Sequence, residues 1–462
     1  MSDFVGQMHQ SVIRAAFSVR HGHRPYGRLS ALLEQSQYWP WPRLQEMQVE
    51  KLTRLIQHAY EDVPFYRRRF DLAGVQPASV KAVEDLGRLP ILTKHDIQTH
   101  LTDLIARDVD RARLLENHTG GSTGEPLTFY QDANFSAWSE ADKLRCYRMA
   151  GYQLGQRWAF LWGSDYDGQA HRGWRGRLGD RVVYNLMWIN TFDLTADTLE
   201  RAAAQLALWR PQMLVAYVSS ATLLARLIVS RELPPLQLRT IQTSAEVLTP
   251  ADRQLLEATF NCPVFDRYGC REVNNIAHEC ERHRGRHILA ENNVVEVVDD
   301  AGRPVGPGQL GRIVLTNLNN HAMPLIRYEV GDLGIAADAA CDCGRELPML
   351  KTIIGRTTDV ITSPSGRLLH GEFFTHLFYK VTGVQQFRVL QLTRRDLLIE
   401  IVPAPNFDQA RTLAFLENTI HQHGDVAFKV EFALRDGIPA SASGKYRFTQ
   451  SEVALNIAND QR

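Results

Sequence analysis

The sequence lacks the features that mark secreted, membrane-spanning and nucleic-acid-binding proteins. Its first residues, MSDFVGQMHQSVIRAAFSVRHGHRP, contain no uninterrupted apolar core followed by a small-residue cleavage site. No later stretch reaches the ~20 apolar residues that cross a bilayer. The 52 basic and 52 acidic side chains balance, so no overall positive field attracts a phosphate backbone. We therefore expect a cytoplasmic protein with a small-molecule substrate and no membrane or nucleic-acid partner.

Cysteine is scarce, and no internal repeat or low-complexity segment is present. In a reducing compartment, cysteines are better explained as thiols or metal ligands than as disulfides. The length of 462 residues exceeds the usual size of one domain, so two or more units are expected. The six cysteines are Cys146, Cys262, Cys270, Cys280, Cys341 and Cys343.

The hydrophobic pattern predicts an α/β protein. Residues 29–70 have helical spacing that breaks at Val63-Pro64. From Trp158 onwards, short apolar runs alternate with amphipathic stretches, including a strand at Thr240–Ser244 and a helix at Pro250–Phe260. This alternation is typical of a layered α/β core.

The pattern changes towards hairpins beyond Asn292 and changes again after Arg356. We predict a large multi-layer N-terminal domain over residues 1–355, with a helical segment at about 29–70 and a β-rich subdomain at about 273–350. Residues 356–462 are predicted to form a small, mobile α+β lid.

The densest chemical signal is the stretch HTGGSTGEP at residues 118–126. Glycines let the backbone approach an anion, while hydroxyls and successive amides donate to phosphate oxygens. No Gly-Lys-Ser/Thr ending follows, so this is not a Walker A loop. Alone, such a stretch is more often a turn or linker. The candidate phosphate-binding residues are Thr119, Gly120, Gly121, Ser122, Thr123 and Gly124.

Four further motifs follow the glycine-rich stretch in order along the chain, and together with it they resemble a known family. They are YGCRE at 268–272, RYEVGD at 327–332, Gly355-Arg356, and SGK at 443–445. With them the chain resembles the adenylate-forming superfamily of acyl-CoA synthetases, luciferases and peptide-synthetase adenylation domains. The N-terminal stretch that includes HAYEDVPFYRRRF and the cysteine pattern are similar to the branch of phenylacetate-CoA ligases and CapK-like proteins.

The resemblance implies a role for each motif. The glycine-rich loop would wrap the β- and γ-phosphates, and Glu272 would help to hold Mg²⁺, as a hard carboxylate ligand can. Asp332 would accept hydrogen bonds from the ribose hydroxyls, and Lys445 would reach the reacting oxygens when the lid closes. Tyr268-Gly269 would lie near adenine, Arg356 would contact ribose or phosphate, and Ser244, Ala245 and Glu246 would line the adenine and acyl pocket.

Each of these residues also has a simpler interpretation, and two positions depart from the superfamily pattern. A strand-end acid, a hairpin Asp, a surface Arg and an exposed loop Lys would look the same in isolation. Leu127 stands where many relatives carry a lysine after the proline of the loop. Thr358, beside Asp359, stands where many relatives carry the Asp or Lys about which the lid rotates.

A metal centre is predicted from Cys280-x-x-His283 and Cys341-x-Cys343. Two such pairs suit tetrahedral zinc with soft ligands. His278 and His287 compete with His283 for the fourth place, and buried free thiols are the alternative to a metal. In CapK-like relatives, a similar set is associated with structural zinc.

The predicted function is ATP-dependent activation of a carboxylic acid to an acyl-adenylate, followed by acyl transfer to coenzyme A. The alternatives are an AMP-forming ligase or adenylyltransferase with an amine, hydroxyl or other acceptor, and a zinc-containing nucleic-acid-binding protein. The run YNLMWINTF at 184–192 could line an aryl-acid pocket, although Trp188 and Phe192 equally suit the core. The oligomeric state stays open, with a homodimer as one option.

Overall fold

A computed structural model of the full chain describes residues 25–119, 127–162, 184–190, 196–356, 360–370, 373–374, 377–378, 380–439 and 448–453. No helix in these ranges is both long enough and apolar enough to cross a membrane.

The N-terminal helices follow the predicted break at Val63-Pro64. Val63 is extended, with φ −109° and ψ 106°, and Pro64 begins the next helix at a position where its missing N–H is not needed. The chain therefore turns sharply without losing a hydrogen bond. The helices are α2 (Pro25–Ser36), α3 (Trp41–Asp62), α4 (Pro64–Ala73) and α5 (Lys94–His100).

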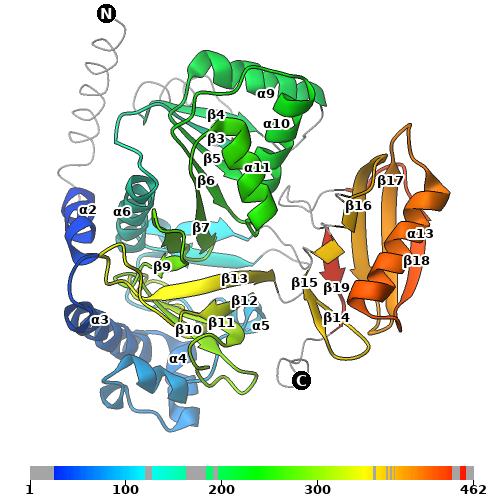
Figure 1. The fold of residues 1–462 in the computed structure, drawn as a ribbon. Coiled ribbons are helices and arrows are strands. Elements are labelled where there is room, and N and C mark those ends of the chain that lie inside the picture. The colour runs from blue at the N-terminus through cyan, green and yellow to red at the C-terminus, as the bar shows by residue number, and fades with distance from the viewer. Residues whose placement is uncertain are drawn as a thin grey trace, which may run out of the picture.

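One mixed sheet forms the centre of the molecule (Figure 1). Among the described residues it has 11 strands in the order β10-β11-β12-β13-β9-β8-β7-β6-β5-β3-β4. Strands β3 to β7 run parallel, and the remaining neighbours pair antiparallel. The bounds are β3 (Trp158–Trp162), β4 (Leu186–Asn190), β5 (Met213–Tyr217), β6 (Thr240–Ser244), β7 (Val264–Cys270), β8 (Asn274–Glu279), β9 (Arg286–Ile288), β10 (Asn293–Val298), β11 (Leu310–Asn317), β12 (Tyr328–Ala336) and β13 (Met349–Arg356).

Helices cover both faces of the parallel part, because its strands are apolar on both sides. In β5, Leu214 and Ala216 pack with α9 (Ala196–Trp209), α10 (Val218–Ser230) and α11 (Pro250–Phe260). The alternate residues Met213 and Val215 pack with α2 and with α6 (Ala133–Met149). This is the pattern expected of a buried parallel strand. The hairpin of β1 (Leu115–His118) and β2 (Thr128–Gln131) leads into and out of the glycine-rich loop.

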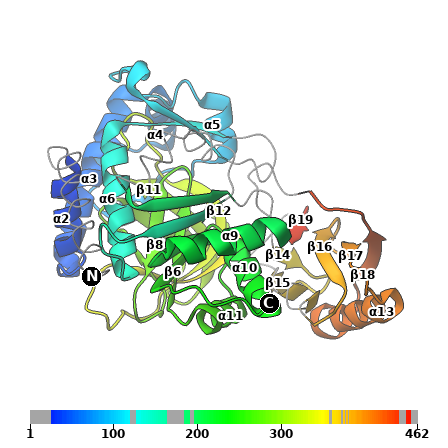
Figure 2. The same cartoon turned by 90° about the horizontal axis from the view of Figure 1, so that it is seen from above.

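The C-terminal part has a separate four-stranded sheet in the order β18-β17-β16-β19, packed on α13. Figures 1 and 2 both show it beside the large central sheet rather than within it. The predicted α/β class with a smaller C-terminal unit is confirmed, whereas the boundary at residues 355–356 stays a prediction. The bounds are β14 (Val360–Thr362), β15 (Leu368–His370), β16 (Val384–Gln391), β17 (Asp396–Pro403), α13 (Gln409–Thr419), β18 (Lys429–Leu434) and β19 (Thr449–Ser451).

Candidate active site and candidate metal centre

Asp332 lies where three strands bring polar side chains together. It is the cross-strand partner of Arg356, whose Nε lies 3.0 Å from Asp332 Oδ1. The hydroxyl of Tyr268, near the end of β7, donates to Asp332 Oδ2 at 2.8 Å. Each carboxylate oxygen can accept more than one hydrogen bond, so Asp332 is held in place and can still accept from a ligand. The motifs at 268, 332 and 356 therefore meet at one point.

Burial and charge fix the ionisation states of Tyr268 and Arg356. Burial, reinforced by the Asp332 carboxylate, raises the pKa of Tyr268 well above its ordinary value. The Asp332 carboxylate is also the main reason that the pKa of Arg356 is raised. Near neutral pH, Tyr268 is consequently a hydrogen-bond donor and Arg356 a cation.

Glu272 lies in the turn after β7 and is held from two sides. Only 4% of its surface is exposed, and the Tyr328 hydroxyl donates to its Oε1 at 2.6 Å. Gln131 Nε2 donates to its backbone carbonyl at 3.1 Å. Gly269 is required in the strand before it, because a Cβ there would lie 2.0 Å from the carbonyl oxygen of Asn274. The YGCRE motif thus sets a carboxylate in a fixed position.

The side chains of residues 244–246 contact two different parts of the fold. Ser244 Oγ donates to the carbonyl of Arg267 at 2.9 Å, beside Tyr268. Ala245 has a left-handed φ of 70°, which turns the chain. Glu246 then accepts from the backbone N–H of Ser219 at 2.6 Å, in the first turn of α10. Nucleotide contacts from Ser244, Ala245 and Glu246 stay predictions, and the Glu246 carboxylate already has a structural use.

The base of the glycine-rich loop is closed by a pair of hydrogen bonds. The Thr119 N–H donates to the Leu127 carbonyl at 2.9 Å, and the Leu127 N–H donates to Thr119 Oγ1 at 2.9 Å. Arg271 donates to Asn117 Oδ1 at 3.2 Å, which ties this base to the Glu272 turn. Several predicted residues lie outside the described ranges: Gly120, Gly121, Ser122, Thr123, Gly124, Thr358 and Lys445.

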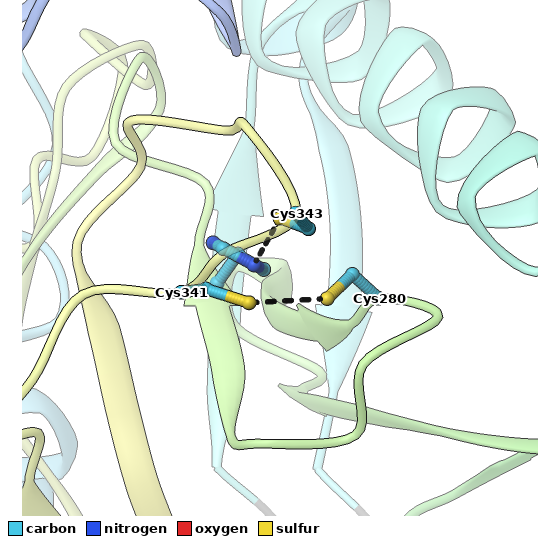
Figure 3. A group of neighbouring side chains, drawn as sticks. Cys280, Cys341 and Cys343 are labelled. Atoms are coloured by element: carbon cyan, nitrogen blue, oxygen red, sulfur yellow. Dashed lines mark hydrogen bonds between the residues drawn. The ribbon is translucent and has the colours of Figure 1, made fainter.

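Three cysteines and one histidine converge at the other candidate site (Figure 3). Cys280 Sγ and Cys341 Sγ are 3.6 Å apart, and Cys343 Sγ lies 3.3 Å from His287 Nε2. All four ligand atoms lie within 4.8 Å of one another. His287 Nδ1 faces the carbonyl of Leu347 at 3.3 Å, so this nitrogen is the donor and Nε2 offers its lone pair to the cluster.

The structure brings His287 to this cluster rather than the predicted His283. His283 has a left-handed φ of 50° in the tight turn that follows Cys280, and its side chain leaves the cluster. Its Nδ1 lies 3.1 Å from Glu279 Oε2. His278 is also elsewhere, with Nε2 2.9 Å from Gln242 Oε1. His287 takes the place because β9 pairs with β13, opposite Met349, just beyond the Cys341–Cys343 loop.

Known proteins of similar sequence belong to the family that the sequence motifs resemble. The chain is 32% identical over 333 residues to the phenylacetate-coenzyme A ligase of Thermus thermophilus, covering 70% of this chain and 72% of the relative. The chain belongs to the phenylacetate-CoA ligase family. Residues 361–452 match the family model of the CapK C-terminal domain.

Solved structures show the same fold. A 2-hydroxyisobutyryl-CoA ligase in the postadenylation state matches with a TM-score of 0.72 at 22% identity, covering 90% of this chain and 93% of that one. The same ligase in its thioesterification state matches with a TM-score of 0.61, covering 90% and 91%.

Lys94 lies near this group of side chains, although no motif marks it. Burial and the Arg356 charge lower its pKa, while Glu272 and Asp332 oppose that shift, so the ammonium lies within the field of the site. A backbone bridge between Leu92 and Tyr328 draws this segment alongside β12. The only local signal was the capping box at Thr93–Asp96, which places Lys94 at the first position of α5.

Replacing Lys94 with methionine should weaken ATP use about tenfold, because one cation near the phosphate-binding motifs is lost. We expect most of the change in the KM for ATP if Lys94 binds the ground state, and in kcat if it acts at the transition state. Initial rates over a range of ATP concentrations measure both. Lys81→Met removes an exposed lysine from the same segment and should leave the rates unchanged. Equal rates for the two variants would contradict the prediction.

Proposed function

We propose that this chain is an AMP-forming acid-CoA ligase. A carboxylate oxygen attacks the α-phosphorus of ATP, so an acyl-AMP forms as the bond to pyrophosphate breaks. The CoA thiol then loses its proton and attacks the acyl carbonyl, forming a thioester and releasing AMP. The observation that carries the proposal is Asp332 held between Tyr268 and Arg356 in a chain of the phenylacetate-CoA ligase family.

Each side chain of this group has a distinct task. Asp332 accepts from the ribose hydroxyls with lone pairs that Tyr268 and Arg356 leave free. The Tyr268 hydroxyl is committed to Asp332, so its ring is the part that contacts adenine. Arg356 contributes positive charge on the ribose and phosphate side. Thr119 to Gly124 wrap the terminal phosphates, and Lys445 contacts the reacting oxygens when the lid closes.

Glu272 is the residue that would hold Mg²⁺. The Tyr328 hydroxyl donates to Glu272 Oε1. Hard carboxylate oxygens are the ligands that Mg²⁺ prefers. Bound Mg²⁺ would neutralise phosphate charge. Lys94 adds a further positive charge near the same place.

The cysteine cluster has the composition and spacing of a structural zinc site. Bonds of about 2.3 Å to sulfur and about 2.0 Å to nitrogen in a tetrahedron imply S···S near 3.8 Å and S···N near 3.5 Å. The separations of 3.6 Å and 3.3 Å are within a few tenths of an ångström of those values. We propose Cys280, His287, Cys341 and Cys343 as ligands, with all positions filled by protein. Such thiolates persist in a reducing compartment, which supports a cytoplasmic location.

An aromatic acid is the substrate class that the described residues favour. Trp162 and Tyr217 end the parallel strands β3 and β5, and their ring centroids are 3.9 Å apart. Tyr217 is the register partner of Ser244. Trp162 and Tyr217 therefore lie at the carboxyl ends of the parallel strands, as the 244–246 stretch does. Trp188 instead stacks on Phe160 at 4.7 Å, a contact that suits core packing.

A pyrophosphate-release screen tests the proposal. Aryl, fatty and amino acids are each supplied with ATP and Mg²⁺, with and without CoA, and both AMP and thioester are measured. We expect release with aryl acids and thioester only when CoA is present. Acyl-AMP that accumulates despite CoA would point to an amine, hydroxyl or carrier acceptor. Failure of every acid class to release pyrophosphate would contradict the proposal.

A further inference from the structure

A second group of metal-ligand side chains lies at the C-terminal end of α3. His58 and Asp62 are one helical turn apart and face the same side. Asp108 approaches from the loop between α5 and β1. His58 Nδ1 is 3.4 Å from Asp62 Oδ2 and 3.9 Å from Asp108 Oδ2, and the three ligand atoms lie within 4.8 Å of one another. None of these residues belongs to the nucleotide site or to the cysteine cluster.

The hydrogen bonding of His58 fixes which nitrogen faces the carboxylates. Its Nε2 lies 2.9 Å from the backbone carbonyl of His321. A carbonyl can only accept, so Nε2 carries a hydrogen. In the neutral ring, Nδ1 then presents a lone pair to both carboxylates. A metal-binding histidine usually coordinates the ion through one ring nitrogen and donates the N–H of the other to a carbonyl or carboxylate.

Three acceptors that point at one another need a positive charge between them. Within the described ranges, the ion pairs recorded for Asp62 and Asp108 are both with His58. Either a proton on Nδ1 or a bound cation can supply that charge. Ligands about 2.1 Å from an ion lie about 3.0–3.5 Å from one another. The observed separations are close to this range, and half-exposed Asp108 is on a loop that can adjust.

We propose that His58, Asp62 and Asp108 form a metal site for a first-row divalent cation. One imidazole and two carboxylates suit Mn²⁺, Co²⁺, Ni²⁺ or Zn²⁺ better than Ca²⁺ or Mg²⁺, and three protein ligands leave positions for water. The ion would join the end of α3 to the segment that leads into β1 and the glycine-rich loop. The Arg107 N–H already donates to the Asp62 carbonyl at 3.0 Å, so the two segments are in register for this link.

Manganese binding to the nucleotide-free protein tests the site, because thiolate clusters disfavour this ion. The paramagnetic resonance signal of hydrated Mn²⁺ disappears on binding, which gives stoichiometry and affinity. We expect one Mn²⁺ per chain, and at least about tenfold weaker binding for both Asp108→Asn and His58→Gln. The matched control is Asp103→Asn, which removes an acid of the same loop that pairs with Arg68. Its affinity should equal that of the unaltered protein.

Two results would overturn the proposal. One is that the unaltered protein binds no Mn²⁺ at millimolar concentration, which would mean that a proton on His58 holds the carboxylates. The other is that either ligand variant binds Mn²⁺ as the control does. Melting temperatures measured without metal identify any variant that has failed to fold, and Asp62→Asn then replaces it.

Discussion

Replacing Asp332 with alanine should slow ATP-dependent pyrophosphate exchange by about 10²–10⁴-fold. The carboxylate is held by Tyr268 and Arg356 so that it can accept from two ligand hydroxyls. Each charge-assisted hydrogen bond is worth about 1.5–3 kcal/mol, and alanine removes both. Incorporation of labelled pyrophosphate into ATP, with an acid that the enzyme accepts, measures the effect directly.

Two companion variants separate this loss from a loss of folding. Asp332→Asn keeps the size of the side chain but removes its charge, so exchange should fall while the melting temperature changes little. Asp338→Ala removes an exposed acid that follows the same strand and pairs with Lys351. Its exchange rate should be unchanged. An Asp332→Ala protein that exchanges pyrophosphate at the rate of Asp338→Ala would exclude Asp332 from the nucleotide site.

The secondary structure was predictable where the signals are local. The break at Val63-Pro64 rests on proline geometry alone, and the structure changes helix there. The strand β6 and the helix α11 have the predicted bounds, because Thr249 caps the helix and Pro250 begins it. The sequence did not predict that the antiparallel strands join the parallel strands in one sheet. That arrangement depends on β8 pairing antiparallel with β7.

The candidate nucleotide site was predictable as a set of residues but not as a set of contacts. The motifs identify Tyr268, Asp332 and Arg356, yet the bond between the first two spans 64 residues of sequence. It forms only in the folded sheet, where Tyr268 of β7 meets Asp332 of β12. The pairing of β12 with β13 then places Arg356 opposite Asp332. Lys94 was missed for a similar reason: a bridge from Leu92 to β12 brings its segment near these residues, and no spacing rule shows that.

The proposed metal centre shows a limit of spacing rules. Cys280-x-x-His283 has the usual form of a zinc-ligand pair, but the tight turn directs His283 to Glu279. His287 is farther along the chain and nearer in space. Short spacing predicts which residues can share a metal only when the turn between them points both side chains the same way.

Loss of the zinc proposed at the cysteine cluster should destabilise the protein substantially. A ligand present at about a thousand times its dissociation constant stabilises the folded state by about 4 kcal/mol. The segment just after Cys343 also contacts the turn between α2 and α3, because Arg345 Nε donates to Gln37 Oε1 at 2.9 Å. Cys280→Ser should therefore lose the zinc and lower the melting temperature by about 4–5 °C. Elemental analysis and thermal unfolding measure the two effects.

Two histidine variants decide whether the metal or the local packing is responsible. His287→Asn should lose zinc and melt at a temperature similar to that of Cys280→Ser, since each variant removes one of the four proposed ligands. His283→Asn should retain zinc, because its ring contacts Glu279 rather than the cluster. A strong chelator should then lower the melting temperature of His283→Asn and leave that of His287→Asn unchanged. Zinc retained by His287→Asn and lost by His283→Asn would mean that the turn after Cys280 rearranges when metal binds.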